Sequence, residues 1–468
     1  MSLRNPTDPR TLHRHPSSQR HFNAIAIVTG GLLLTAAPVT ADSETPASGE
    51  LTRGMRWVRS HPFTLMALTI NPKTFHVQQY RDQAGLNTLL AWKPFEDLFK
   101  KAVAAELPWH MHVYPHPNGL DDQRKALIRR LYDSYPGSTG CMVWDEPNRQ
   151  GMIAGAKTLE WLRKHYPDML VYSNALPGGG PSHKYVGNAP PPGGAYSYEQ
   201  YLRDFVTIMK SDIVMYDAYP FKEDGDTINL LPILATAREV ALEHGVPYWT
   251  FVQSSSDPNR RYRMPSESDI RMQVFMHLTY GFTGIAYFTY GDEQGPAMVS
   301  LPPPGTLNPI LYDVGRLNGE VKNIGRSLRW LTSTDVRLVP GPESSGHAGV
   351  GTWEPGAGGD TSIRAITIHD DAPDHWKDIL VGLFRDDDGH RYVMVTNLWH
   401  DKDRSSSDRQ LSITLTFDPS ITQISRLSRE TGRSELLVTD RGDLHLTLAG
   451  GTGELLRPGG GSFPDVPR

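Results

Sequence analysis

The sequence predicts a (β/α)8 TIM barrel followed by a C-terminal antiparallel β-sandwich. Strand and helix patterns alternate eight times over about 270 residues, the number and length that such a barrel needs. Most of the predicted strands are short and apolar, as buried parallel strands are. After residue 335 the pattern changes to strands separated by acidic, glycine-containing turns. A doubly wound open sheet is the alternative, but no Gly-x-Gly-x-x-Gly follows the first strand.

Each predicted barrel strand is followed by a helical pattern. The strands are expected at residues 64–70, 88–92, 109–114, 141–144, 169–173, 212–216, 248–252 and 284–289. The helices are expected at residues 74–84, 95–106, 121–135, 152–165, 198–210, 230–244, 267–280 and 309–331. Several of them end in glycine before the next strand, which is typical of helix C-termini. The barrel domain is therefore placed at residues 60–334.

Residues 335–460 are predicted to form the β-sandwich domain. Apolar runs flank an acidic turn at Asp386–Gly389, which indicates a hairpin. Further strands are expected at residues 411–417, 444–448 and 453–456. The proline- and glycine-rich tail at 461–468 is expected to fray.

The N-terminus has the pattern of an export signal. Arginines precede an apolar run at residues 24–34, and Val39-Thr40-Ala41 offers small residues for cleavage. We therefore expect a signal peptide at 1–41 and a tether at 42–59; an uncleaved anchor is the alternative. Cys141 is the single cysteine, so no intrachain disulfide exists. An exported protein without disulfides fits a secreted or periplasmic location in a bacterium.

The composition favours a globular enzyme over a nucleic-acid or membrane-surface protein. The chain has 468 residues, 38% of them hydrophobic, and a net charge of −5. This content allows a large core, and the charge suggests neither nucleic acid nor an anionic membrane as a partner. No nucleotide motif is present and no cofactor is expected; the oligomeric state cannot be read from the sequence. The glycine- and proline-rich loop at 177–194 is either a lid or a tolerated insertion.

Two strand ends carry a carboxylate followed by a proline. Glu146 and Pro147 follow the fourth strand, and Asp217 follows the sixth. The carboxyl ends of barrel strands form the catalytic face, and strand alternation places Met142, Trp144 and Glu146 on one face with Asp145 on the other. Two acids meeting across the barrel mouth would acquire different pKa values. Such a pair predicts acid/base catalysis on a sugar.

Other strand ends supply groups that could hold hydroxyls or stack on a sugar ring. The candidate substrate-binding residues are Trp92, His110, His112, Tyr114, Asp145, Asn174, Tyr216, Tyr219, Gln253, Tyr287 and Tyr290. His110 and His112 have the spacing of a metal pair. However, no other strand end supplies a histidine, so no metal site is expected.

The Trp-Asp-Glu-Pro motif at 144–147 and the sandwich after the barrel resemble the large group of (β/α)8 glycoside hydrolases. The closest type is the retaining, clan A-like superfamily whose acid/base glutamate ends strand 4. The segments Tyr216–Phe221 and Tyr287–Glu293 resemble β-galactosidase-like barrels. The resemblance covers most of residues 60–455 and implies Glu146 as the acid/base residue.

The sequence departs from that superfamily at the seventh strand. The superfamily places its nucleophilic glutamate there, whereas this strand ends with Gln253 and no acid. Asp145 also stands where the superfamily usually has asparagine. The partner of Glu146 is therefore Asp217, as in α-galactosidase-type barrels that pair strand-4 and strand-6 acids, or else Asp292 or Glu293.

The preferred prediction is an exported glycoside hydrolase that cleaves O-glycosidic bonds in a poly- or oligosaccharide. Glu146 would protonate the leaving oxygen, and Asp217 would act as nucleophile or base. Because strand 7 lacks an acid, the alternative is a catalytically silent carbohydrate-binding barrel.

Overall fold

The computed structural model describes residues 50–466, except for 116–117, 189–195, 227–229, 292–294, 343, 345 and 370–376. The predicted signal peptide therefore lies outside the described residues, as do Asp292 and Glu293. Among the residues described, no helix combines the length and apolar character that crossing a membrane requires.

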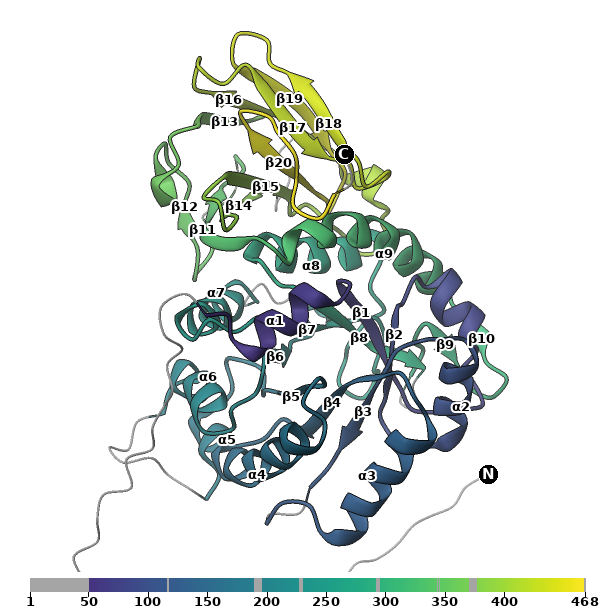
Figure 1. Ribbon diagram of the computed structural model, residues 1–468. Helices are drawn as coiled ribbons and strands as arrows, with labels where there is room; N and C mark the ends of the chain where they lie inside the picture. The colour runs from purple at the N-terminus through teal and green to yellow at the C-terminus, as the bar shows by residue number, and fades with distance from the viewer. Residues whose placement is uncertain are drawn as a thin grey trace, which may run out of the picture. The chain divides into compact units, whose positions relative to one another are not determined.

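Within this part of the chain, eight parallel strands form the predicted barrel (Figure 1). The strands are β1 (Thr64–Thr69), β2 (Thr88–Ala91), β3 (Trp109–Val113), β4 (Ser138–Asp145), β5 (Leu170–Asn174), β6 (Val214–Asp217), β7 (Tyr248–Gln253) and β8 (Gly284–Gly291). Neighbouring strands pair in parallel from β6 through β7, β8 and β1 to β5. A backbone bridge between Ala175 and Tyr216 closes the ring between β5 and β6.

Helices cover the outside of the barrel in the predicted order. They are the π-helix Gln78–Gln83, α2 (Glu96–Ala104), α3 (Asp122–Ser134), α4 (Arg149–His165), α5 (Ser182–Val186), α6 (Tyr198–Thr207), α7 (Leu230–Glu243), α8 (Glu267–Tyr280) and α9 (Pro309–Leu328). Helix α5 lies in the loop whose role the sequence left open. The short strands β9 (Val299–Ser300) and β10 (Thr306–Leu307) extend the sheet beside β8.

Helix α1 (Arg53–Ser60) replaces the last part of the predicted tether. Trp57 and Val58 are buried against barrel-interior side chains such as Met215 and Trp249. The prediction of a tether at 42–59 is therefore wrong for residues 53–59, which are helical and packed. This helix closes the end of the barrel opposite the carboxyl ends of the strands, which leaves the latter end free for a site.

The C-terminal region is the predicted β-sandwich. Its larger sheet has the order β12-β11-β14-β15-β20-β17-β18, and its smaller sheet the order β13-β16-β19. The strands are β11 (Thr332–Val339), β12 (Gly351–Thr352), β13 (Ile363–His369), β14 (Ile379–Arg385), β15 (Arg391–Asn397), β16 (Leu411–Phe417), β17 (Gln423–Leu427), β18 (Ser434–Val438), β19 (Asp443–Leu448) and β20 (Gly453–Pro458). Side chains such as Val381, Val395 and Ile413 form the core between the two sheets.

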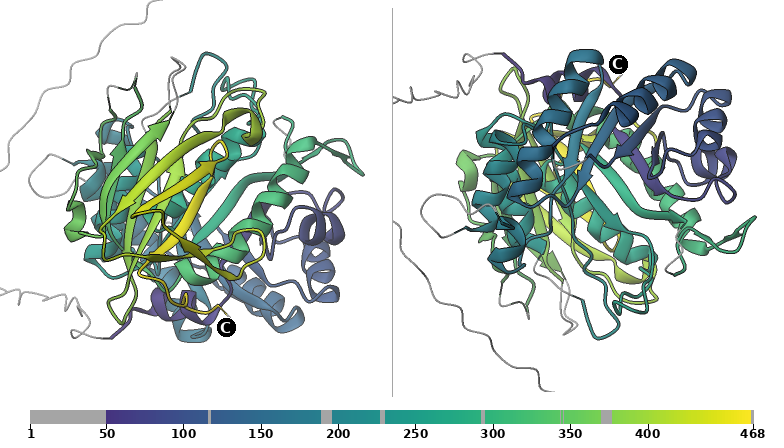
Figure 2. Two further views of the ribbon diagram at one scale, coloured as in Figure 1. Left: turned by 90° about the horizontal axis from the view of Figure 1, so that it is seen from above. Right: turned by 90° about the horizontal axis from the view of Figure 1, so that it is seen from below.

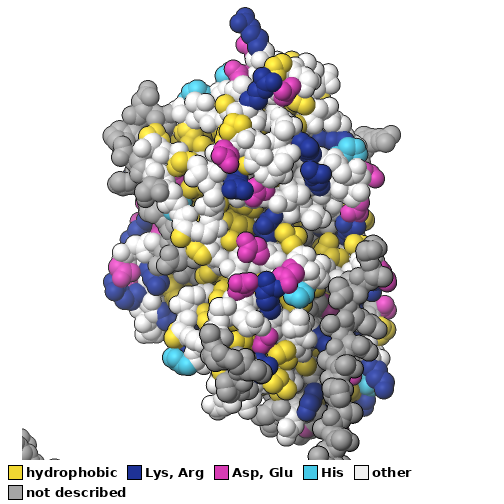
Figure 3. Space-filling model, turned by 90° about the vertical axis from the view of Figure 1, so that its left-hand side faces the viewer, with side chains coloured by type: hydrophobic (Ala, Val, Ile, Leu, Met, Phe, Trp, Pro, Cys, Tyr) yellow, Lys and Arg dark blue, Asp and Glu magenta, His cyan; other side chains and the backbone are white. Residues whose placement is uncertain are grey.

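Helix α8 lies between the barrel and the sandwich (Figure 1). Seen from above, the strands of the sandwich lie in front of the barrel (Figure 2, left). A capping box of Ser266 and Asp269 fixes its start. The helix is buried on nearly all sides, so even Gln273 and His277 have little exposure. Acidic and basic side chains are interspersed on the face that Figure 3 shows, in keeping with the small net charge.

Candidate active site

The carboxyl end of β4 departs from regular strand geometry. Trp144 and Glu146 have φ values of 64° and 50°, in the left-handed region. The pairing of β4 with β5 shifts between Met142 and Asp145. Non-glycine residues rarely adopt this conformation, and it costs free energy that the surrounding structure must offset. Such strained positions concentrate at functional sites.

The irregular backbone changes which side chains face the barrel mouth. Trp144 packs outward, close to Gly151 and Pro147 at the start of α4. Asp145 instead turns toward Asn174. The prediction that Trp144 shares a face with Glu146 is therefore wrong, because strict alternation fails where φ is positive. Asp145 and Glu146 therefore both face the site.

Asn174, at the end of β5, bridges two of the acids. Its side-chain nitrogen donates to Asp217 at 2.9 Å and to Asp145 at 3.1 Å. Its backbone oxygen accepts a hydrogen bond from the N–H of Glu146 at 2.9 Å. The structure thus places this predicted sugar ligand in the site as a positioning residue for three carboxylates.

The carboxyls of Glu146 and Asp217 lie close enough that each affects the protonation of the other. Asp217 is 9% exposed, whereas Glu146 is exposed at the pocket wall. Burial raises the pKa of Asp217 well above its usual range, and the carboxyls of Glu146 and Asp145 raise it further. The hydrogen bond from Asn174 acts in the opposite direction. A shared proton therefore resides on Asp217.

The pKa values of Glu146 and Asp145 are raised less than that of Asp217. Desolvation by the pocket walls raises the pKa of Glu146, although the interaction with Asp217 and the charges of Arg260 and Lys184 lower it. Burial raises the pKa of Asp145 to about 6. Of the three acids, Asp217 therefore holds a proton most readily, and carboxyls that differ in this way suit acid/base catalysis.

A pocket of about 750 Å³ opens beside this pair. Glu146, Asp217 and Tyr219 line it together with residues of the loops after β5, β6 and β7. Tyr219 stacks on Phe288 at 5.1 Å and meets the ring of Tyr262 edge-on at 6.0 Å. The position of Tyr219 agrees with its predicted role in substrate binding.

An aromatic row lies beside the acids at the ends of β2, β3 and β4. Trp92 stacks on His112 with ring centroids 3.9 Å apart, and His112 meets Tyr114 edge-on at 5.8 Å. Tyr114 contacts Trp144 at 5.1 Å and is 54% exposed. Burial lowers the pKa of His112 to about 3, so its imidazole is neutral. Trp92, His112 and Tyr114 remain candidates for contact with a sugar.

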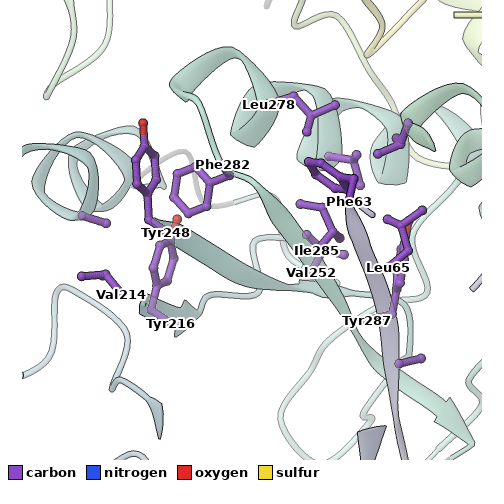
Figure 4. Packing of buried hydrophobic residues seen from close by; sticks show 14 of the residues in the cluster. Phe63, Leu65, Val214, Tyr216, Tyr248, Val252, Leu278, Phe282, Ile285 and Tyr287 are labelled. Carbon is purple, nitrogen blue, oxygen red and sulfur yellow. The ribbon is translucent and has the colours of Figure 1, made fainter. Parts of the chain in front are cut away.

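Three predicted tyrosines face away from the site. The hydroxyl of Tyr216 pairs with His277 of α8 at 2.9 Å, and that of Tyr287 donates to Asn318 of α9 at 2.6 Å. Figure 4 shows Tyr216 beside Phe282 in this packed layer. Tyr290 is buried against aromatic side chains before and within the π-helix. These three predictions are wrong, because the residues occupy the outward-facing positions of their strands.

His110 and Gln253 are also structural. His110 lies deep in the barrel, where its Nδ1 pairs with the hydroxyl of Tyr172 at 2.9 Å. Burial lowers its pKa to about 3. The amide of Gln253 bonds to backbone groups of Phe221, Ser255 and Arg263, which fixes the loops after β6 and β7. Neither side chain is free to bind a sugar, so both predictions are wrong.

Four residues that line the pocket were not predicted from the sequence. Lys184, Lys222, Arg260 and Tyr262 line the pocket but lie in loops, several residues beyond the strand ends. Reading only the residues that end each strand misses such positions. The sequence does carry a signal for these positions, because charged residues recur in the three successive loops after β5, β6 and β7.

Two groups of side chains in the described residues have ligand atoms close enough to hold a metal. One joins Asp226, Asp269 and His400, but the guanidinium of Arg263 already binds both of its carboxylates. The other joins Asp386, Asp388 and His390 on the sandwich. Neither group includes Glu146 or Asp217.

The chain matches no protein-family model and no curated protein. Among solved structures it is similar to an endo-β-1,4-mannanase from Thermotoga petrophila, with 12% identity and a TM-score of 0.39 over 74% of this chain and 97% of that one. A family 51 α-L-arabinofuranosidase from Bifidobacterium longum gives 7% identity and a TM-score of 0.41, over 87% and 96%. A β-galactosidase from Marinomonas ef1 gives 10% and 0.40, over 58% and 62%.

Proposed function

We propose that the protein is a glycoside hydrolase that cleaves O-glycosidic bonds in a poly- or oligosaccharide. The observation that carries the proposal is the interacting pair of Glu146 and Asp217, which line one pocket of about 750 Å³. One carboxyl holds a proton and the other is ionised, at the strand ends where barrel enzymes keep their chemistry. Aromatic rings beside the pair offer surfaces for sugar stacking.

The electrostatics favour Asp217 as the general acid. In this mechanism Asp217 gives its proton to the glycosidic oxygen as the bond to the anomeric carbon breaks. The carboxylate of Glu146 attacks that carbon and forms a glycosyl ester. A water molecule then attacks the ester, giving its proton to Asp217 and releasing Glu146. These roles are the reverse of those that the sequence resemblance implies.

The contact between the two acids supports retention of configuration. Inverting enzymes separate their carboxyl groups by about 6.5–9.5 Å to admit a water, whereas retaining ones keep them about 5–5.5 Å apart. Carboxyls that interact as closely as Glu146 and Asp217 favour the second distance. Following the first-formed anomer of the product by NMR distinguishes the two outcomes.

Glu146→Gln and Asp217→Asn test the pair and its roles. On a natural glycan, each variant is expected to lose about 10²–10⁴-fold in rate. On a dinitrophenyl glycoside, whose leaving group needs no protonation, Asp217→Asn should recover most of kcat/KM, which reports the first step, and Glu146→Gln should not. The opposite pattern restores Glu146 as the acid, and wild-type rates in both variants would refute the site.

Gln253 favours a second candidate, a carbohydrate-binding barrel without catalysis. Strand β7 offers this amide where a nucleophile is expected by resemblance, and the amide is held by backbone hydrogen bonds. This candidate predicts glycan binding by the wild type with no release of sugar under any condition tested.

We further propose that the protein is exported to the periplasm or the exterior. The arginines, the apolar run and the small residues before Asp42 support this proposal. Expression of the full chain in a bacterium, followed by N-terminal sequencing of the exported protein, should give a new terminus at Asp42. Protein retained in the cytoplasm with its first residues intact would contradict it.

A further inference from the structure

We propose that the saccharide bound beside Glu146 and Asp217 carries a negative charge, as a uronate carboxylate or a sulfate ester, and that Lys184, Lys222 and Arg260 recognise it. The inference rests on the proposed function, because it concerns the same pocket. It adds the chemical class of the substrate.

The three cations come from three successive loops at the catalytic end of the barrel. Lys184 lies in α5 after β5, Lys222 follows β6, and Arg260 lies in the loop after β7. All three line the pocket of about 750 Å³ that Glu146 and Asp217 line. Separate loops thus converge on one cavity with the same charge.

These cations are available to a ligand. Arg260 is 3.5 Å from Asp257, but its side chain remains 64% exposed, so this ion pair is weak. Within the described residues, neither Lys184 nor Lys222 takes part in an ion pair. Lys184 is exposed and Lys222 is half-buried, so both amines keep contact with water and lose little hydration on meeting an anion.

Neighbouring cations outside the pocket are neutralised. Arg261 pairs with Asp224 at 3.1 Å, and Arg263 binds Asp226 at 2.8 Å and also binds Asp269. In the loop after β7, the strongly paired Arg261 and Arg263 therefore lie outside the pocket, and the weakly paired Arg260 lines it. A bound anion would neutralise the positive charges of Lys184, Lys222 and Arg260 in the pocket.

The cations also act on the catalytic pair. The charges of Arg260 and Lys184 reach Glu146 and favour its ionised form. If that were their whole role, their removal would shift the pH profile equally for neutral and charged glycans. Recognition of an anion instead predicts a loss confined to charged glycans, so substrate pairs that differ only in charge separate the two roles.

The experiment compares each charged glycan with its own neutral derivative. A uronate polymer is paired with its carboxyl-reduced form, and a sulfated polymer with its desulfated form. The proteins are the wild type, the triple variant Lys184→Ala, Lys222→Ala, Arg260→Ala, and the control Lys164→Ala, whose amine is exposed in the last turn of α4. The readout is kcat/KM at two salt concentrations.

For one of the two pairs, wild type and control are expected to favour the charged member at least about 10-fold, with the preference falling as salt screens the charges. The triple variant should bring the ratio close to one. A preference in the uronate pair would identify a carboxylate as the recognised group, and a preference in the sulfated pair would identify a sulfate ester.

Equal rates on both members of each pair would overturn the inference and leave the hydrolase proposal standing. So would a preference that survives in the triple variant. If no glycan is cleaved, the hydrolase proposal fails instead, and calorimetric titration with the same pairs decides the inference. Tighter binding of a charged member, lost in the triple variant, would support it; equal or absent binding would overturn it.

Discussion

The side-chain nitrogen of Asn174 lies 2.9 Å from a carboxylate oxygen of Asp217 and also donates to Asp145. One amide therefore stabilises two acids that repel each other and the nearby Glu146. It also limits how far burial raises the pKa of Asp217. Asn174 thus sets both the geometry and the protonation of the proposed catalytic pair.

Replacing Asn174 should change the pH dependence of activity. Asn174→Ala removes the bond that favours ionised Asp217, so the pKa of Asp217 rises further. The alkaline limb of the pH–rate profile, where the general acid loses its proton, should move to higher pH. The rate at the optimum should fall about 10-fold or more because the acids are no longer held in place.

The control is Asn323→Ala, which removes an amide bound to backbone oxygens of Arg429 and Glu430 on the sandwich side. It should leave both limbs where they are. An Asn174→Ala profile that loses height without any shift would assign this residue a purely structural role.

Replacing Asp217 with a residue that cannot ionise should stabilise the protein at neutral pH. The native state keeps the proton on Asp217 to a higher pH than the unfolded chain, whose aspartates titrate near pH 3.9. Stability is therefore lost as pH rises from that value through the raised native pKa. Asp217→Asn avoids this loss, so its advantage in melting temperature should grow from about pH 4 to pH 8, reaching a few degrees.

The matched control is Asp212→Asn. Asp212 is also buried, but it binds Arg53 and Arg163. Loss of its charge leaves two arginines without their partner, so this variant should melt at a lower temperature than the wild type. A lower melting temperature for Asp217→Asn as well would contradict the assignment of a raised pKa.

Regular periodicity explains what the sequence could predict. Apolar runs gave all eight barrel strands, because parallel strands buried on both faces need apolar side chains throughout. Apolar runs do not show which way each side chain points: Tyr216 lies in β6 and Tyr219 just after it, and only Tyr219 lines the pocket. At the end of β4, the positive φ values of Trp144 and Glu146 change the direction in which the side chains point. Neither residue is a glycine, so the sequence does not predict this backbone conformation.

Tyr216 and Tyr219 give a direct test of that distinction. Tyr216→Phe removes a buried hydroxyl that pairs with His277, so the free energy of unfolding should fall by about 1 kcal/mol. Its kcat/KM should stay within about twofold of the wild type. Tyr219→Ala removes a pocket wall and should raise KM at least about fivefold. Urea unfolding and steady-state kinetics on both variants check this; a raised KM in Tyr216→Phe would return that residue to the site.

The cluster of Asp226, Asp269 and His400 should prove to be an ion-pair network rather than a metal site. Burial alone would raise the pKa of Asp269, but hydrogen bonds from His400 and Arg263 outweigh it and leave the pKa low. Because Arg263 occupies the position between the two carboxylates, a chelator should change neither activity nor melting temperature. Arg263→Met should destabilise the fold by about 3–5 kcal/mol, since it leaves buried carboxylates without their cation. A melting temperature that falls with chelator and recovers with a divalent cation would instead show that a metal stabilises the junction between the barrel and the sandwich.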